Sequence, residues 1–337
     1  MQRIARLNCS MALTAAILAV APVPSFANDS SAELLLGGLV FTKSADVSME
    51  SEDLQITPET VTVRYRFVNQ SAAPVTLTVA FPLPDLDLSE ADSYAIPTND
   101  PNNFVGFATK VDGKPIDFKV EQRAALGDKD VTDLLRELKV PLMAIGNGQN
   151  FSDLPDSART RLIDAGLLIQ VGTTERNKPI YGAGWKVKTT VVRQQTFPPK
   201  QPVEVEHSYK TSLGASVDTV LRKAVRQNKG MAKELERYRK DYCVTDQFLA
   251  GVDKIAGSGE ANTASVQERR ISYILKTGAN WAGPIKQFRL VVDSGKPGQL
   301  VSFCAANAKA ISPTATEVVA KDFMPTRDIK ILIVGKF

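Results

Sequence analysis

The stretch Val61-Thr62-Val63-Arg64-Tyr65-Arg66-Phe67 decides the fold class, because apolar and polar residues alternate in it with a period of two. The alternation returns in Val75-Thr76-Leu77-Thr78-Val79-Ala80-Phe81, after the turn-like sequence Asn69-Gln70-Ser71-Ala72. This period places the apolar side chains on one face of an extended strand. The two stretches therefore predict a β-hairpin with one buried face, which Pro82 and Pro84 end.

Segments of the same character recur along the chain. Asp112-Gly113 is a turn pair typical of a tight hairpin and predicts one between residues 110–111 and 116–120. Residues 104–109 also suggest a strand, and apolar or alternating runs predict strands at 185–195, 203–211, 271–276, 287–293, 300–303 and 329–334. The chain is therefore expected to be mainly β.

Two regions have helical character instead. Leucines at helical spacing before Pro141 and a helix start at Pro155 predict a helical insertion over about 128–169. A second helical insertion is predicted over about 217–256, where Thr245 is placed to cap a short helix. Together the patterns predict an α+β chain, mainly β, with two antiparallel β-sandwich-like domains. Residues 28–126 would form the N-terminal sandwich, and residues 127–337 a β-rich domain that carries both insertions.

Residues 1–27 have the layout of a signal peptide. Arg3 and Arg6 precede an apolar run over 11–21, and Ser25 and Ala27 fit the small-residue positions of a cleavage site. The alternative, a retained membrane anchor, is disfavoured because about 20 apolar residues are needed to span a bilayer. We expect cleavage after Ala27, a periplasmic protein and no later transmembrane segment. Removal of both arginines lowers a formal net charge of +4, so nucleic acid is not an expected partner.

The cysteines suggest one disulfide. Cys9 would leave with the signal peptide, and Cys243 and Cys304 would remain in an oxidising compartment. A redox pair is the alternative, but such pairs usually lie close together as Cys-x-x-Cys. A metal site is disfavoured because His207 is the only histidine in the chain.

Catalytic motifs are absent from the sequence. His207 lies in an alternating stretch on the same face as Val203 and Val205, so a structural role is favoured over a catalytic triad. The sequence contains no G-x-S-x-G, H-E-x-x-H or phosphate-binding loop motif. We therefore assign no catalytic residue, no metal ligand and no cofactor.

Two aromatic and glycine-rich loops are candidate ligand contacts. Residues 276–285 contain Asn280 and Trp281, and residues 181–185 contain Tyr181 and Trp185. An indole offers a stacking face and an amide offers hydrogen bonds, which suits a sugar or a peptide. The alternative is that each tryptophan folds back to cap the core while the glycines provide the turn. A ligand role would be favoured if both loops lay at one end of the fold.

The helical stretch 222–240 is strongly basic. Eight Lys and Arg residues accompany only Glu234 and Glu236 there. Such a helix could contact anionic lipid, lipopolysaccharide or an acidic partner, although a run of charges is usually a solvated face.

A set of motifs resembles a known family. They are Asn28-Asp29-Ser30, Gly37-Gly38-Leu39, residues 61–69 (VTVRYRFVN), residues 79–84 (VAFPLP), Glu206-His207-Ser208-Tyr209, Tyr242-Cys243, the 277–285 loop, residues 288–293 (FRLVVD) and Ser302-Phe303-Cys304. The chain resembles the bacterial domain of unknown function 4424 family over nearly all of the mature part. The resemblance implies an exported protein of Gram-negative bacteria and supports the cysteine pairing, but it transfers no catalytic residue. The N-terminal part is also similar to the vault/inter-alpha-trypsin domain, which implies a β-sandwich fold and no function.

These observations predict a non-enzymatic binding or scaffolding protein of the cell envelope. Its partner would be an envelope glycan, a lipid or a protein. The alternative is a hydrolase of cell-wall glycan or peptide that uses two carboxylates, because Asp and Glu are numerous and their spacing in the fold is not visible in the sequence.

Overall fold

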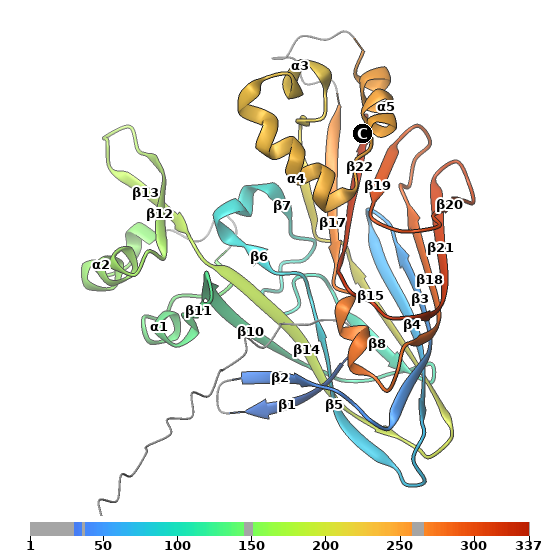
Figure 1. Cartoon of the computed structure of the whole chain (residues 1–337). Helices are drawn as coiled ribbons and strands as arrows, with labels where there is room; N and C mark the ends of the chain where they lie inside the picture. Colours follow the sequence, from blue (N-terminus) through green and yellow to red (C-terminus); the bar gives the residue numbers. More distant parts are fainter. Residues whose placement is uncertain (1–29, 36–37, 145–150, 258–265, 337) are drawn as a thin grey trace, which may run out of the picture.

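The computed structural model describes residues 30–35, 38–144, 151–257 and 266–336 (Figure 1). The predicted signal peptide lies outside these residues. The fold is mainly β, as predicted, with several antiparallel sheets and few helices. In the described part of the chain, no helix is both long and apolar enough to cross a bilayer.

The longer strands belong to three sheets. Their bounds are β1 Ser30–Leu35, β2 Gly38–Thr42, β3 Val47–Ile56, β4 Thr60–Asn69, β5 Val75–Pro82, β8 Ala108–Val111, β10 Lys119–Leu126, β14 Lys186–Phe197, β15 Pro202–Lys210, β16 Leu213–Ser216, β17 Gln267–Tyr273, β18 Ile285–Asp293, β19 Leu300–Phe303, β21 Ala315–Phe323 and β22 Ile329–Gly335. The short strands are β6 Leu86–Asp87, β7 Tyr94–Ala95, β9 Lys114–Pro115, β11 Lys129–Asp130 and β20 Lys309–Ala310, and a separate hairpin consists of β12 Leu168–Thr173 and β13 Pro179–Ala183.

The order of the strands defines the three sheets, which we call the first, second and third sheet. The first runs β11-β10-β14-β5-β1-β2, with β6 also paired to β14. The second runs β20-β21-β18-β3-β4-β15-β8-β9, and the third runs β19-β22-β17-β16-β7. In the second sheet β18 is parallel to β3, and β15 lies beside β4, so strands from both sides of the predicted boundary at residues 126 and 127 share one sheet.

The predicted hairpin of residues 61–67 and 75–81 is wrong, although both strands are present. β4 pairs with β3 and β15 in the second sheet, whereas β5 pairs with β14 and β1 in the first. The buried side chains of both strands belong to one hydrophobic core. Asn69 helps to turn the chain between the sheets, because its side-chain amide donates to the carbonyl oxygens of Ala73 and Phe197 at 2.8 and 3.0 Å. Alternation thus identified buried faces that lie in different sheets.

Other local predictions are confirmed in part. Asp112 and Gly113 both have positive φ, 49° and 77°, and form the predicted turn between β8 and β9. The predicted second strand over 116–120 is wrong, because β9 is confined to Lys114–Pro115 and residues 119–120 belong to β10, which pairs with β14. The strand predicted over 104–109 is instead confined to β8, which begins at Ala108. The hydroxyl of Thr245 accepts a hydrogen bond from the Phe248 amide at 3.1 Å and caps helix α5 (Asp246–Ala256).

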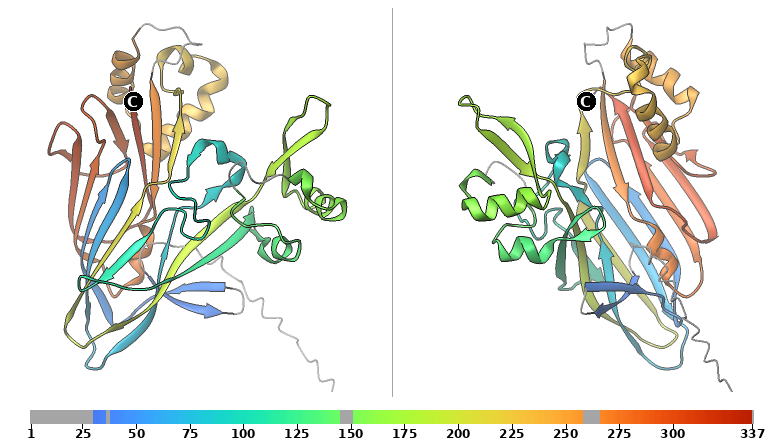
Figure 2. Two further views of the ribbon diagram at one scale, coloured as in Figure 1. Left: turned by 180° about the vertical axis from the view of Figure 1, so that it is seen from behind. Right: turned by 60° about the vertical axis from the view of Figure 1, so that its left-hand side comes forward.

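The helices occupy the two predicted insertions. Helices α1 (Thr132–Glu137) and α2 (Asp156–Asp164) accompany the β12–β13 hairpin in an arm beside the first sheet (Figures 1 and 2). Helices α3 (Lys223–Arg226), α4 (Ala232–Tyr242) and α5 lie at the third sheet. Four short 3₁₀ turns complete the described elements: η1 Leu88–Ser93, η2 Phe151–Asp153, η3 Lys229–Met231 and η4 Lys276–Asn280.

Strand β22 is buried on both faces because two hydrophobic clusters meet there. Ile331 and Ile333 belong to the main core, whereas Leu332 and Val334 pack with α4 and α5 in a second cluster. Helix α5 lies very close to β19, since a Cβ atom on Gly251 would come within 2.9 Å of Leu300 Cδ1. The disulfide between Cys243, directly after α4, and Cys304, directly after β19, joins this helical layer to the third sheet.

Candidate functional site

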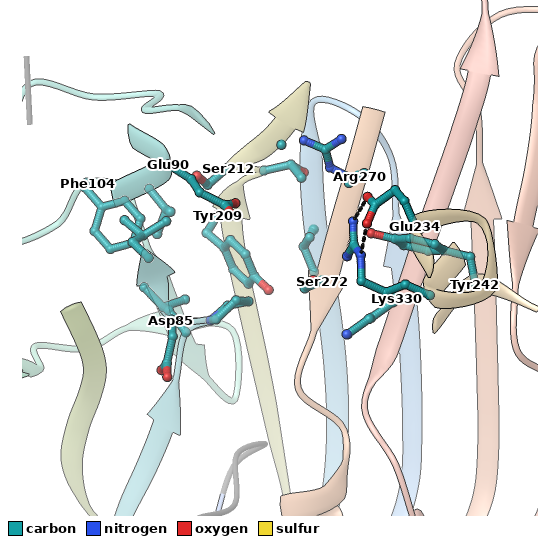
Figure 3. A pocket seen from close by; sticks show the side chains of 18 residues that line it. Asp85, Glu90, Phe104, Tyr209, Ser212, Glu234, Tyr242, Arg270, Ser272 and Lys330 are labelled. Carbon is teal, nitrogen blue, oxygen red and sulfur yellow. Dashed lines mark hydrogen bonds and ion pairs between the residues drawn. The ribbon is translucent and has the colours of Figure 1, made fainter. Parts of the chain in front are cut away.

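A polar cavity of about 700 Å³ lies where the three sheets meet. It is bounded by the segment that follows β5, the end of β15, strands β17 and β22, and helix α4. Figure 3 shows Tyr209 between two walls. Its lining includes Asp85, Glu90, Phe104, Tyr209, Thr211, Ser212, Glu234, Arg237, Tyr242, Arg270, Ser272 and Lys330.

The first wall carries two carboxylates, Asp85 and Glu90. Pro82 and Pro84 end β5, and buried Leu83 and Leu86 anchor the segment, so that Asp85 between them faces the cavity. Neither carboxylate forms an ion pair with a described residue. Burial against the protein raises the pKa of Asp85, although its side chain remains accessible to water, and the charges of Lys188 and Lys186 oppose that rise.

The second wall carries charges that are already paired. Arg237 donates to Glu234, with one nitrogen–oxygen distance of 2.9 Å, and these hydrogen bonds hold the pKa of Glu234 below its ordinary value. Lys330 Nζ lies 2.8 Å from an oxygen of Asp241. Burial raises the pKa of Tyr242 to about 12, so its hydroxyl stays protonated and can donate at neutral pH.

Arg270 belongs to the second wall, and buried polar side chains fix its position. It donates to the carboxylate of Glu268, which is only 1% exposed and also accepts from the Tyr238 hydroxyl. Burial raises the pKa of Tyr238, and the charge of Glu268 adds to the effect. This arrangement fixes the guanidinium of Arg270 at the edge of the cavity, because a buried ion pair with added hydrogen bonds has little freedom.

A second cavity of about 690 Å³ adjoins the first. The two share Leu83, Pro84, Asp85, Ser272 and Lys330 as lining residues, so they form one cleft that passes the segment after β5. The second cavity continues between β10 and β14 on one side and the end of β17 on the other. A concave space of this size, lined by polar and apolar groups together, suits a ligand.

The two tryptophans of the predicted loops do not line this cleft. Trp281 is fully buried, with its ring 4.5 Å from that of Phe67 and 5.9 Å from that of Phe197. Trp185 is also fully buried and donates from Nε1 to the carbonyl oxygen of Leu142 at 2.8 Å. Strand β14 begins directly after Trp185 and ends at Phe197, and its 12 residues span about 40 Å. The structure therefore does not bring the two loops together, and both indoles pack in the core.

Tyr181 and Asn280 are half-buried and lie away from the cleft as well. Tyr181 is in β13 and packs against the main core. Asn280 ends η4, and its carbonyl oxygen accepts a hydrogen bond from the Ser44 amide at 2.8 Å. Neither lines one of the two cavities.

His207 is buried among aromatic rings, in agreement with a structural role. Its ring lies 5.0 Å from those of Phe81 and Phe107 and 5.7 Å from that of Tyr65. It is 1% exposed and faces the core, as its position in the alternating strand predicts. Within the described ranges, no group of three or more His, Cys, Asp and Glu side chains could hold a metal ion.

The arginines of the basic stretch are paired within the protein. Their partners are Asp218 for Arg222, Asp253 for Arg226, Glu234 for Arg237 and Asp246 for Arg239. Tyr238 and Tyr242 form the buried face of α4, and Lys223, Lys229, Lys233 and Lys240 are exposed. Internal pairing thus neutralises part of the charge that the sequence suggested for an acidic partner.

Sequence reasoning missed the residues of the cleft. The one local signal was the Pro82-Leu83-Pro84-Asp85 segment, where two prolines end a strand directly before a carboxylate. Tyr209, Arg270 and Lys330 occupy unremarkable strand positions, and only the pairing of distant strands brings them to one place.

Residues 27–332 match the family described as a domain of unknown function, DUF4424, and the chain belongs to that family. Among solved structures, it is similar to a candidate nutrient-binding protein from Legionella pneumophila, with 14% identity, a TM-score of 0.41, and coverage of 87% of this chain and 68% of the other. It is also similar to an M1 zinc metallopeptidase from Deinococcus radiodurans, with 9% identity, a TM-score of 0.24, and coverage of 88% and 44%. Both likenesses are too distant to transfer a site. None of the curated proteins matches the chain.

Proposed function

We propose that this protein is an exported, periplasmic binding protein that takes its ligand in the cleft formed by the two adjoining cavities. The observation that carries the proposal is the cleft itself, which is lined by both polar and apolar groups and carries carboxylates that have no ion-pair partner among the described residues. A ligand that brings positive charge to these carboxylates would gain charge-assisted hydrogen bonds, and a concavity of this size can enclose one. The signal-peptide layout of residues 1–27 and the disulfide support export.

Native mass spectrometry tests this function. The protein is purified from the periplasm of its own host without reductant and compared with a Ser272→Trp variant. Ser272 lines both cavities and its side chain is exposed, so the indole fills the cleft without entering the core. We expect a bound species on the wild-type protein and its loss from the variant, with unchanged circular dichroism. A bare wild-type protein, or a species retained equally by Ser272→Trp, would reject the cleft as the binding site.

One observation favours a carboxylate-dependent hydrolase as a second candidate function. In the first cavity the pKa of Asp85 is raised and that of Glu234 is lowered, a separation that suits an acid and a base. Arg237 binds Glu234, however, and opposes its use as a base. Release of soluble products from purified cell-wall material by the wild-type protein, abolished in both Asp85→Asn and Glu234→Gln, would establish this function; no release by the wild-type protein would remove it.

A further inference from the structure

Strand β17 presents an open edge to the cleft. Strand β22 pairs with the whole of β17, from Gln267 to Tyr273, but β16 pairs only with Glu268–Arg270. In an antiparallel sheet successive residues direct their backbone N–H and C=O groups to opposite sides. One of the two residues Ile271 and Ser272 therefore directs both groups away from β22, and the described part of the chain supplies no further strand there.

The edge is open because the segment that leads from β15 to β16 passes from the second sheet to the third sheet at this point. Thr211 follows β15 and is still held to the second sheet, since its amide donates to the Glu59 carbonyl at 3.1 Å and its hydroxyl to the Thr57 carbonyl at 3.0 Å. The chain joins β17 only from Gly214 onward, opposite Arg270. In Figure 3 the two strands diverge around Tyr209 and Ser272, and both residues line the first cavity.

The second cavity of the cleft is acidic, whereas carboxylates and cations are balanced in the first. Five carboxylates and three cations line the second cavity: Asp85, Glu121, Asp128, Asp130 and Asp328 against Arg123, Lys188 and Lys330. Asp130 is paired with Arg123, but Glu121, Asp128 and Asp85 form no ion pair with a described residue. Glu90 adds another such carboxylate in the first cavity.

We propose that the cleft binds an extended peptide segment that carries Lys or Arg. Its main chain pairs with β17 at Ile271–Ser272, and a cationic side chain lies against Asp85. This inference rests on the proposed binding function and specifies its ligand class. A peptide fits better than a glycan because its N–H and C=O groups recur at strand spacing and match the open edge, while the carboxylates select positive charge.

Defined peptides test the inference on the full mature chain. The probes are Ala-Lys-Ala-Lys-Ala, its counterpart with Glu in place of Lys, and the lysine peptide with alternate amides N-methylated. Chitotetraose serves as a glycan probe. We expect saturable binding of the lysine peptide, at least tenfold weaker binding of the other two peptides, and slowed amide hydrogen exchange in the segment 271–273 when the lysine peptide is bound.

Variants locate the binding. The double variant Asp85→Asn, Glu90→Gln should bind the lysine peptide about tenfold more weakly, because at least one charge-assisted hydrogen bond is lost. Glu175→Gln is the matched control, because Glu175 is an exposed carboxylate in the turn of the β12–β13 arm and should leave binding unchanged. Equal binding of the glutamate or N-methylated peptide, or equal loss in the control, overturns the inference. Binding of chitotetraose that Ser272→Trp abolishes, without peptide binding, rejects the peptide but keeps the cleft as a binding site. If the protein carries no bound species in native mass spectrometry and binds none of the probes, both the proposed binding function and the peptide inference are rejected.

Discussion

At the scale of single residues, Trp281 shows how a chemically suggestive side chain can serve the core. Its loop offered an indole, an amide and two glycines, yet the ring is fully buried against Phe67 and Phe197. The sequence left both roles open because the direction of a side chain from a loop depends on which strands enclose it. Here those strands come from two sheets, and a local pattern does not specify them.

Replacing Trp281 should therefore affect stability and leave binding intact. We expect Trp281→Ala to lower the free energy of unfolding by about 3 to 5 kcal/mol, as for other large buried aromatic residues, and Trp281→Phe to lower it by less. Denaturant titration followed by circular dichroism gives these values, and native mass spectrometry reports the bound species. Loss of the bound species at unchanged stability would instead place the indole in a binding site.

Asp85 gives a prediction about pH. Because burial raises its pKa in the folded protein, the ionised carboxylate destabilises the fold above that pKa, and the penalty disappears as the pH falls below the ordinary value near 4. Asp85→Asn should therefore raise the melting temperature at pH 7 by about 2 °C and give no gain at pH 3.5. The expected gain is small because water reaches the side chain and reduces the cost of its charge. Glu175→Gln is the control at both pH values. A gain that is equal at pH 7 and pH 3.5 would contradict the assignment.

At the scale of elements, the most informative contact is the disulfide that joins α4 to the third sheet. The pairing was predictable from the number of cysteines and the expected export, but its structural role was not. It connects the end of α4 to the end of β19 and closes a loop with a sequence separation of 61 residues. The same helix supplies Glu234, Arg237 and Tyr242 to the cleft, so the disulfide also positions the second wall.

Removing the disulfide should loosen this helical layer. For a loop of this length the chain-entropy relation gives about 4 kcal/mol of stabilisation. We expect the Cys243→Ser, Cys304→Ser double variant to lose about this free energy of unfolding in a denaturant titration. Adding reductant should destabilise the wild-type protein similarly and leave the double variant unchanged. A double variant as stable as the wild-type protein would show that helix packing alone holds α4 in place.

At the scale of the whole molecule, the strands themselves could be predicted and most of their partners could not. Alternating side chains identify β4, β5, β15 and β18 because burial of one face is a local property. Pairing depends instead on which distant segments meet. The wrong hairpin and the missed cleft share this cause, since the cleft forms only where the three sheets meet.

The shared sheets predict cooperative unfolding. The main core contains residues from both sides of position 126, including Tyr65, Trp185 and Trp281. In the variants Trp185→Phe and Trp281→Phe one tryptophan remains as a probe, because the chain has two. We expect tryptophan fluorescence and far-ultraviolet circular dichroism to report the same denaturant midpoint within each variant. A fluorescence midpoint separated from the circular dichroism midpoint would reveal independently unfolding parts.

The parallel pairing of β3 with β18 has a consequence for the order of events in the cell. Asp53 and Arg289 meet across these strands although 236 residues separate them along the chain. Strand β3 is therefore synthesised long before β18, and the second sheet cannot form completely until β18 has been made. In the export that we propose, the second sheet would therefore close only after most of the chain has passed through the translocation channel, and the chain would stay unfolded enough to pass.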